Sequence, residues 1–342
     1  MLPFRRRVRQ IRAVHQPILG TVLDLRVTGA RPAALARAEA VVLGEIERLE
    51  RIFSVFDADS ELSRWRRIDG DAVVSAELAT LFELSAWWQR HSCSVFNPAA
   101  GALTERWQRA EREGVAPRPD ELAVLARQIA TPRFRLEGSQ VRKVGDCRSL
   151  NFNALAKGLV ADLAAQRAIE TVEIDSLLVN LGGDLVHRGT GVAAVGVENP
   201  LRPFDNEAPI AQVRLGNAGL ATSGPARRGF TVAGQRHGQL LDPRTGRPAS
   251  AVSSATVVGP DAASADAAAL VLGVLDPAAG LAWLDSLPAP PRSVVGAPPT
   301  AAIGAAGATG ASSAGGRLAA LVVDGAGTQF RNAAWSELEA RR

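Results

Sequence analysis

The chain is short of the features that mark several classes of protein. Only two cysteines, Cys93 and Cys147, occur in 342 residues, too few for a disulfide scaffold and too far apart for a zinc or redox pair. No stretch reaches the roughly 20 consecutive apolar residues of a membrane-spanning helix, and no internal repeat is found. We therefore expect two ordinary thiols, no integral membrane span, and a globular core, for which 46% hydrophobic content is ample.

Positive charge is in excess mainly at the start of the chain. Lys plus Arg number 39 against 35 Asp plus Glu, and much of the difference lies in Arg5, Arg6, Arg7, Arg9 and Arg12. The rest is nearly neutral, which argues against a nucleic-acid-binding surface. No apolar run of signal-peptide length follows the arginines. We expect residues 1–17 to form a basic N-terminal arm and the protein to be cytoplasmic.

The hydrophobic pattern predicts an α+β fold. Alternation over 21–27 predicts a strand, and apolar residues at helical spacing over 35–53 predict a long helix. Further helices are expected at 77–90, 119–129, about 152–163, 265–275 and 277–285, and strands at 177–181, 193–197, 210–215, 230–232, 252–258 and 318–324. Because no regular βαβ repetition is present, we expect a single large domain with mixed or antiparallel sheets flanked by helices.

One stretch near the C-terminus breaks this pattern. Residues 287–316 are rich in Ala, Gly, Pro and Ser and contain no aromatic residue, so they offer little apolar surface to offset the entropy of ordering. They are expected to be a disordered insertion that interrupts a terminal hairpin. The domain would then span 18–286 and 317–334, followed by a C-terminal tail, 335–342.

Short motifs of small residues follow one another through the chain. Each by itself could be an ordinary turn, because Gly, Pro and Asn supply the backbone angles that turns need. Their fixed succession is harder to explain as a set of unrelated turns. The motifs are residues 96–101 (FNPAAG), 153–158 (NALAKG), 180–184 (NLGGD), 222–224 (TSG), 242–246 (DPRTG) and 264–266 (SAD).

The NALAKG motif has two readings. Lys157 and Gly158 fall in the first two turns of a helix with Asn151 as its expected N-cap, and the N-terminal amides of a helix favour an anion such as pyrophosphate. The alternative is a solvated surface lysine beside a glycine that allows close packing. The residues alone leave both readings open.

The later motifs also have a structural and a functional interpretation. Gly182 and Gly183 follow a strand and would let a ligand or another backbone approach closely, but a tight turn also explains them. Asp266, in the first turn of a helix, is explained by the helix dipole alone. It would equally suit Mg²⁺, which prefers hard oxygens and often takes one or two carboxylates together with substrate phosphates.

Taken in order, the motifs resemble the ApbE family of FAD:protein FMN transferases, over about residues 20–323. The resemblance implies an ApbE-like fold and a Mg²⁺-dependent enzyme that binds FAD, attaches its FMN moiety to a Thr or Ser hydroxyl of an acceptor flavoprotein, and releases AMP. It makes Asp266 and the carbonyl of Ala154 the metal ligands, and Asp266, Lys157 and His237 the catalytic candidates. Flavin contacts are implied at Leu19, Phe56, Val95, Phe96, Asn97, Asn151, Lys157, Gly182, Gly183, Ser223, Gly224, Gln239 and Leu241.

The chain departs from the family at several of these positions. Gln239 stands where the family usually has a histidine, so His237, two positions upstream, serves as a base only if the loop is shifted. Leu270 replaces a threonine that normally adds a hydroxyl to the metal site. Family members are often exported or lipid-anchored, unlike the cytoplasmic protein expected here. Milder changes occur at Leu19 (usually Met), Phe56 (usually Tyr), and Asn97 and Asn151 (usually Asp).

Two functions are therefore compatible with the sequence. The first is protein flavinylation by FMN transfer. The second is a relative that binds FAD without transfer, or that slowly hydrolyses FAD to FMN and AMP. One carboxylate and one carbonyl make a weak Mg²⁺ site, so a transferase should bind the metal only together with FAD, whereas a flavin carrier should bind FAD equally well without it.

Overall fold

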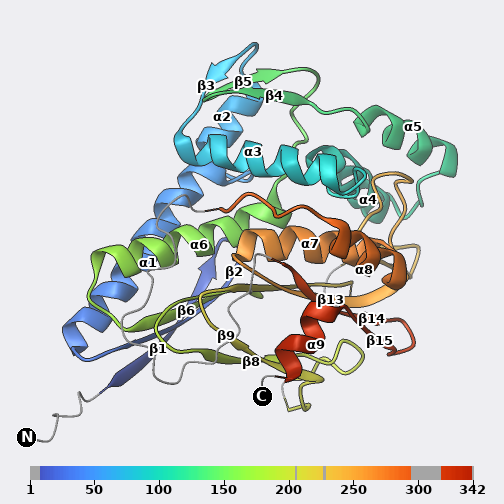
Figure 1. Cartoon of the computed structure of the whole chain (residues 1–342). Coiled ribbons are helices and arrows are strands. Elements are labelled where there is room, and N and C mark those ends of the chain that lie inside the picture. Colours follow the sequence, from blue (N-terminus) through green and yellow to red (C-terminus); the bar gives the residue numbers. More distant parts are fainter. Residues whose placement is uncertain (1–7, 205, 226–228, 294–316, 341–342) are drawn as a thin grey trace, which may run out of the picture.

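An eight-stranded antiparallel sheet forms the centre of the protein (Figure 1). The computed structural model describes residues 8–204, 206–225, 229–293 and 317–340. The strand order is β1-β2-β6-β7-β10-β13-β14-β15, and each neighbouring pair is antiparallel. The strands are β1 (Arg9–Ile18), β2 (Thr21–Gly29), β6 (Ser176–Leu181), β7 (Asp184–Gly189), β10 (Gly219–Ser223), β13 (Val252–Gly259), β14 (Ala319–Asp324) and β15 (Gln329–Arg331).

The sheet is covered on both faces, and β6 reflects this in three successive buried apolar residues, 177–179. Leu177, Val179 and Leu181 belong to the main hydrophobic core, whereas Leu178 belongs to a second core on the opposite face. A strand with both faces covered favours apolar residues at successive positions rather than only at alternate ones. The sheet therefore divides the molecule into two packed layers of side chains.

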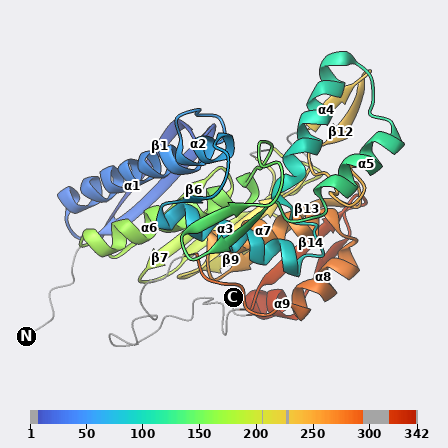
Figure 2. The same ribbon diagram turned by 90° about the horizontal axis from the view of Figure 1, so that it is seen from above.

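Four helices cover the first face (Figures 1 and 2). α7 packs against β10 and β13 and also against α6, which in turn contacts α1. Nearly every residue of α7 is buried, as expected for a helix that is apolar on all sides. These helices are α1 (Pro32–Phe53), α6 (Asn153–Thr171), α7 (Ala262–Val274) and α8 (Pro277–Ser286).

An outer layer lies on the far side of these helices (Figure 1). Its aromatic centre is Phe82, whose ring lies 4.7 Å from those of Trp65 and Phe134 and 5.3 Å from that of Phe152. These contacts join the outer layer to the start of α6. The layer consists of α2 (Glu61–Arg67), α3 (Ala76–His91), the 3₁₀ turn η1 (Pro98–Ala100), α4 (Gly101–Glu113), α5 (Pro119–Ile129) and a small sheet, β3 (Ala72–Val73), β5 (Gln140–Lys143) and β4 (Phe134–Glu137).

Shorter elements complete the molecule. The hairpin of β8 (Ala193–Val197) and β9 (Ala211–Leu215) and the helix α9 (Ala333–Ala340) cover the second face of the main sheet around the fully buried Trp335. A second hairpin, β11 (Gly229–Val232) and β12 (Gln235–Gly238), packs against α4. Within the described residues, no helix combines the length and apolarity needed to cross a bilayer.

The α+β architecture with antiparallel sheets flanked by helices is confirmed. α5 begins and ends where the sequence predicts, but α1 begins at Pro32 rather than at 35, and the starts of α6 and α7 also differ. α7 begins at Ala262 because Asp261 caps it by accepting a hydrogen bond from the Ser264 amide at 2.8 Å. Asp266 therefore lies in the second turn, not the first. The cap of α6 is Phe152 rather than Asn151, whose Oδ1 instead accepts from the Asn153 amide at 2.8 Å.

The termini also differ from the expected boundaries. β1 takes up most of the expected N-terminal arm and pairs with β2 as an edge strand. α9 takes up much of the expected C-terminal tail. Of the expected insertion, residues 294–316 lie outside the described residues. The stretch separates α8 from β14, and the terminal hairpin of β14 and β15 is continuous rather than interrupted.

Candidate active site

Three charged side chains from three elements converge beneath the outer layer. Lys157 of α6 donates a hydrogen bond from Nζ to Oδ2 of Asp184, the first residue of β7. The same Nζ lies 3.8 Å from Oδ2 of Asp266 on α7. The two carboxylates are 3% and 12% exposed, and the lysine side chain is 30% exposed. The structure thus brings together two of the predicted catalytic residues and adds a second carboxylate.

Burial controls the protonation of this cluster. Desolvation, then the neighbouring Asp184 charge and a hydrogen bond with Asp184, raise the pKa of Asp266 to about 8, against the opposing attraction of Lys157. Desolvation also raises the pKa of Asp184, but the Lys157 ammonium opposes that shift by attraction and by hydrogen bonding. Asp184 therefore carries the negative charge that balances Lys157, and Asp266 is the carboxyl that takes up a proton when no other cation is near.

The crossing of α6 and α7 fixes the distance between Lys157 and Asp266. Gly158 lies directly against the start of α7, where a Cβ would come within 2.6 Å of the carbonyl carbon and oxygen of Ala262. One turn further along α6, the Asp162 carboxylate accepts hydrogen bonds from the amides of Ala262 and Ala263 at 2.9 and 3.0 Å. The close-packing role of Gly158 is therefore real, and it sets the geometry of the charged cluster.

Asp162 is also the hub of a buried polar network. Ser293 Oγ donates to its Oδ2 at 2.9 Å, and Arg188 Nη2 lies 3.4 Å from its Oδ1. Burial and the nearby Asp261 carboxylate raise the pKa of Asp162 to about 7, while Arg188 and the two backbone amides act in the opposite direction. This network anchors the N-terminus of α7, from which Asp266 projects one turn later.

The glycine pair positions Asp184. Gly182 and Gly183 adopt φ of +64° and +101°, a region that favours glycine, and the Gly183 amide donates to Asn180 Oδ1 at 3.0 Å. A Cβ on Gly182 would lie 2.4 Å from Thr21 Oγ1. The two glycines therefore form a tight turn. Because of this turn, β7 starts with a carboxylate that faces Lys157.

The FNPAAG motif is held together by internal contacts. Val95 and Phe96 are buried in the main core. Asn97 donates from Nδ2 to the Ile129 carbonyl at 2.9 Å and accepts from the Ala99 amide at 2.9 Å. These three predicted flavin contacts thus lie in the interior, and both the nitrogen and the oxygen of the Asn97 side-chain amide have hydrogen-bond partners. The Asn151 amide donates to the carbonyl of Pro98 at 2.8 Å, which joins this motif to the start of α6.

The DPRTG turn is seated on α4. The Gly246 amide donates to the Asp242 carbonyl at 2.7 Å, and the Gly246 carbonyl accepts from Trp107 Nε1 at 2.9 Å. Arg244 forms an ion pair with Asp242 at 2.9 Å. Of the predicted flavin contacts near this turn, Leu241 is buried, Gln239 is exposed, and Ser223 and Gly224 are half-buried at the end of β10.

His237 does not join the charged cluster. It lies on β12 opposite Phe230, and its ring centre is 4.9 Å from that of Trp107. None of the contacts that the described residues give it involves Lys157 or Asp266. Of the other positions, Leu19 is partly buried and Phe56 is 87% exposed. Leu270, one turn after Asp266 on α7, packs against the main core.

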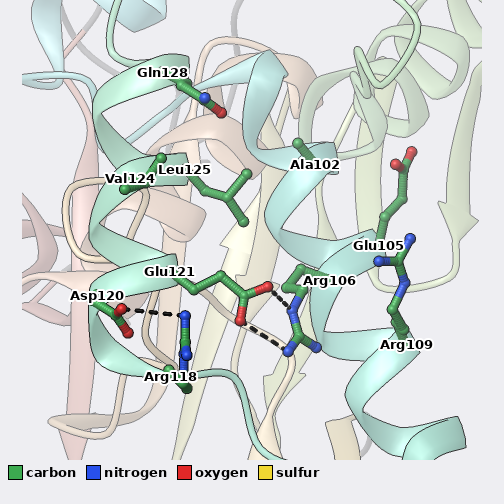
Figure 3. A pocket seen from close by; sticks show the side chains of 10 residues that line it. All are labelled: Ala102, Glu105, Arg106, Arg109, Arg118, Asp120, Glu121, Val124, Leu125 and Gln128. Carbon is green, nitrogen blue, oxygen red and sulfur yellow. Dashed lines mark hydrogen bonds and ion pairs between the residues drawn. The ribbon is translucent and has the colours of Figure 1, made fainter.

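A groove of about 570 Å³ lies between α4 and α5, away from this cluster (Figure 3). Its charges are balanced, with three arginines and three acidic residues. Arg106 pairs with Glu121 at 3.0 Å, and Arg118 with Asp120 at 3.3 Å. None of the predicted site residues lines it; the lining residues are Ala102, Glu105, Arg106, Arg109, Arg118, Asp120, Glu121, Val124, Leu125 and Gln128.

A comparison with protein-family models matches residues 19–290 to the ApbE family. This chain belongs to the ApbE family. Among curated proteins, the FAD:protein FMN transferase of Treponema pallidum is 29% identical over 283 residues, covering 75% of this chain and 77% of the relative. The enzyme of the same name from Rhodobacter capsulatus is 30% identical over 269 residues, covering 75% of this chain and 50% of the relative. The predicted family and enzyme class, a transferase, are confirmed.

Solved structures of ApbE proteins have the same fold. The ApbE protein of Thermotoga maritima superposes with a TM-score of 0.76 at 21% identity, covering 97% of this chain and 99% of the other. The flavin transferase ApbE of Vibrio cholerae gives 0.74 at 18% identity, covering 97% and 100%. The predicted ApbE-like fold is confirmed by these matches.

In this ApbE protein, a hard cation fits the charged cluster. Among the described residues, no three or more His, Cys, Asp or Glu side chains are grouped to hold a metal ion. However, Asp266 Oδ2 is buried and has no hydrogen-bond partner within the described part of the chain. An unpaired buried oxygen beside a second carboxylate suits Mg²⁺, which takes few protein ligands when substrate phosphates supply the others. Ala154 lies one turn before Lys157 on the same helix.

Asp184 and Asp162 are the residues of this ApbE site that sequence reasoning did not select. Asp184 ends the NLGGD motif. The motif was interpreted through its two glycines, so its carboxylate was not predicted as a site residue. Asp162 lies five residues after Lys157, on a helix where its carboxylate is almost completely buried. A buried carboxylate has to have a partner, and those partners come from distant parts of the chain.

Proposed function

We propose that this protein is a Mg²⁺-dependent FAD:protein FMN transferase that attaches FMN to a Thr or Ser hydroxyl of an acceptor flavoprotein and releases AMP. The observation that carries this proposal is the cluster of Lys157, Asp184 and Asp266, in which one buried carboxylate oxygen accepts no hydrogen bond from the part of the chain that the structure describes. Membership of the ApbE family and the names of the relatives support the choice of substrate.

The proposed reaction is a transfer at phosphorus. The acceptor hydroxyl oxygen forms a bond to the FMN phosphorus of FAD, and the bond from that phosphorus to the bridging oxygen of the pyrophosphate breaks. AMP leaves with the bridging oxygen, and the hydroxyl proton passes to a base or to water. Charge develops on the leaving phosphate, so groups that stabilise negative charge near the pyrophosphate accelerate the step.

The chain provides such groups at one place. Lys157 is partly exposed and would donate to the pyrophosphate oxygens, close to the N-terminus of α6. Asp266 and the Ala154 carbonyl would hold Mg²⁺, which when bound neutralises charge on the phosphates and on the leaving group. We assign no proton transfer to His237, because it packs against Trp107 on the β11–β12 hairpin, or to Gln239, which has no titratable group.

A flavin-binding relative without transfer activity is the second candidate. The observation that favours it is Leu270, which lies one turn after Asp266, packs against the core and offers no oxygen to a metal. Slow hydrolysis of FAD to FMN and AMP would need the same phosphorus chemistry with water in place of the acceptor hydroxyl. Both alternatives predict that the acceptor protein stays unlabelled.

The test is a mixture of purified protein, FAD, Mg²⁺ and an acceptor protein that a competent ApbE enzyme labels. Mass spectrometry of the acceptor should show the gain of one FMN. The gain should disappear with EDTA, and Asp266→Ala should lower its rate at least about 100-fold, as expected when a metal ligand is lost. An acceptor that stays unlabelled while FAD remains bound would refute the transferase in favour of the flavin carrier.

A further inference from the structure

Lys157 hydrogen-bonds to one of the two carboxylates and forms only a longer ion pair with the other. Lys157 Nζ hydrogen-bonds to Asp184 Oδ2, whereas its distance of 3.8 Å to Asp266 Oδ2 is beyond hydrogen-bonding range. Asp266 Oδ2 is buried and accepts no hydrogen bond within the described residues. A lysine ammonium is a compact charge on a flexible stem and could be drawn to either carboxylate. Something in the structure therefore decides between the two.

The position of Asp184 explains why Lys157 hydrogen-bonds to it rather than to Asp266. Asp184 is the first residue of β7, directly after the glycine turn, and pairs with Leu181 of β6. Its side chain is 3% exposed. The glycine turn before Asp184 and the strand pairing of β7 with β6 thus fix the backbone position from which the carboxylate extends. A buried carboxylate without a counter-ion is costly, and Lys157 supplies that counter-ion. Asp266, at 12% exposure, is the less buried of the two.

From this geometry we infer that Asp184 is a positioning residue that engages Lys157 and thereby keeps the Asp266 carboxylate available for the divalent cation. The inference rests on the proposed function, because it assumes that Asp266 binds the metal. If Asp184 lost its charge, Lys157 would turn to Asp266, the nearest remaining carboxylate. A cation would then have to displace the ammonium before it could bind.

This role differs from that of a metal ligand in one measurable way. A ligand acts on the metal directly, so its loss should weaken metal binding whether or not Lys157 is present. A residue that acts by holding Lys157 should have no effect on metal binding once the lysine has been removed. The two roles are therefore separated by combining substitutions at positions 157 and 184.

The experiment measures Mn²⁺ binding to the purified protein in saturating FAD, read from the loss of the free Mn²⁺ signal in electron paramagnetic resonance. We expect Asp184→Asn to raise the Kd for Mn²⁺ about tenfold when Lys157 is present. In the Lys157→Met background, Asp184→Asn should change the Kd less than twofold. Thermal unfolding of each variant identifies loss of fold, and Asp184→Ser replaces Asp184→Asn if the latter does not fold.

The outcomes are distinct. An equal loss of affinity on changing Asp184 in both backgrounds would show that Asp184 binds the metal directly and would overturn the inference. If the unsubstituted protein with FAD binds no Mn²⁺, the proposed metal site itself fails. If it binds Mn²⁺ but labels no acceptor, transfer fails while the inference stands.

Discussion

Leu270 lies on the same face of α7 as Asp266, one helical turn later, and packs against the main core. Leu270→Thr would place a hydroxyl beside the Asp266 carboxylate, and Mg²⁺ favours such oxygen ligands. We expect the Mg²⁺ concentration for half-maximal FMN transfer to fall about three- to tenfold. The free energy of unfolding should fall by about 1–3 kcal/mol, because a partly buried leucine that packs against the core is truncated.

Leu270→Ala is the matched control for this prediction, since it truncates the same side chain without adding an oxygen. It should lower stability and leave the Mg²⁺ requirement unchanged. An equal change in the Mg²⁺ requirement for the alanine and threonine variants would mean that space, and not a hydroxyl, limits metal binding.

His187 is a buried histidine that stays neutral. Its Nδ1 accepts a hydrogen bond from the Asn217 amide at 3.2 Å, and burial, together with the Arg188 charge, lowers its pKa from 6.5 to about 4. Between these two values the unfolded chain binds a proton that the folded protein excludes. This contribution to stability is therefore complete above pH 6.5 and is lost as the pH falls towards 4.

His187→Asn keeps an acceptor atom near the position of Nδ1 and removes the titration. We expect the variant to be less stable than the parent protein at pH 7.5 and the difference to shrink steadily between pH 6.5 and pH 4. Urea unfolding at a series of pH values measures this. A stability difference that is the same at every pH would contradict the assigned protonation of His187.

At the level of single residues, the sequence predicted Lys157 and Asp266 but not their common partner. Both lie in motifs with small neighbours, which mark close approach of backbone or ligand. Their convergence with Asp184 depends on how α6 crosses α7 and on the turn at Gly182 and Gly183. Such geometry is set by contacts between distant segments, and a local pattern does not encode it.

At the level of elements, Gly158 is where α6 and α7 meet. Gly158→Ala would force a Cβ to within 2.6 Å of the Ala262 backbone, so the two helices would have to separate. Overpacking of this kind typically costs about 1–3 kcal/mol, against a gain of up to about 1 kcal/mol from the better helix propensity of alanine. We expect a net loss of about 1–2 kcal/mol in chemical denaturation, with weaker Mn²⁺ binding.

Gly44 offers a matched control on α1, because a Cβ there would meet no atom within 4 Å. Gly44→Ala should raise the free energy of unfolding by up to about 1 kcal/mol and leave Mn²⁺ binding unchanged. If Gly158→Ala behaves like Gly44→Ala in both measurements, the helix crossing does not control the site.

Elements with a strong period were the ones that the sequence predicted well. α1 and α5 have clear apolar stripes and begin with proline, which suits the first position of a helix. β1 was missed because its arginines suggested a basic arm. In the sheet, exposed side chains alternate with partly buried ones such as Ile11, and Arg12 forms an ion pair with Asp24 of β2 at 2.9 Å.

At the level of the whole molecule, the two described ends on either side of residues 294–316 lie near one another. The Ser293 amide donates to Asp261 Oδ2 at 3.3 Å. Leu318 reaches the same corner, where its Cδ2 would lie 2.7 Å from a Cβ on Gly259, two residues before Asp261. A short connection would therefore be long enough to join them.

We expect that replacing residues 294–316 with about six Gly and Ser residues will preserve FAD binding and FMN transfer. Shortening a flexible connection about fourfold is expected to raise the free energy of unfolding by about 1 kcal/mol, because less entropy is lost on closing it. Thermal unfolding and acceptor labelling check both parts. Loss of FAD binding in a folded deletion variant would assign the stretch a functional role.

The global arrangement was only partly accessible from the sequence. The α+β class followed from the mixture of periods, but the eight-strand order did not, because β1, β7 and β15 pair through contacts that no local pattern specifies. The strands at 177–181, 193–197 and 210–215 were predicted, but that the β8–β9 hairpin and α9 together cover the second face of the main sheet was not.

Lys157, which pairs with Asp184, is one of only two lysines in the sequence, and the other is Lys143. Lys143 is engaged elsewhere, with its ammonium 4.9 Å above the Trp65 ring and donating to the Arg66 carbonyl at 3.2 Å. Amine-directed acylation therefore has two side-chain targets in the whole protein, and one is in the proposed active site. The rate at which Lys157 is acylated, with Lys143 as internal reference, reports on the occupancy of that site without any introduced label.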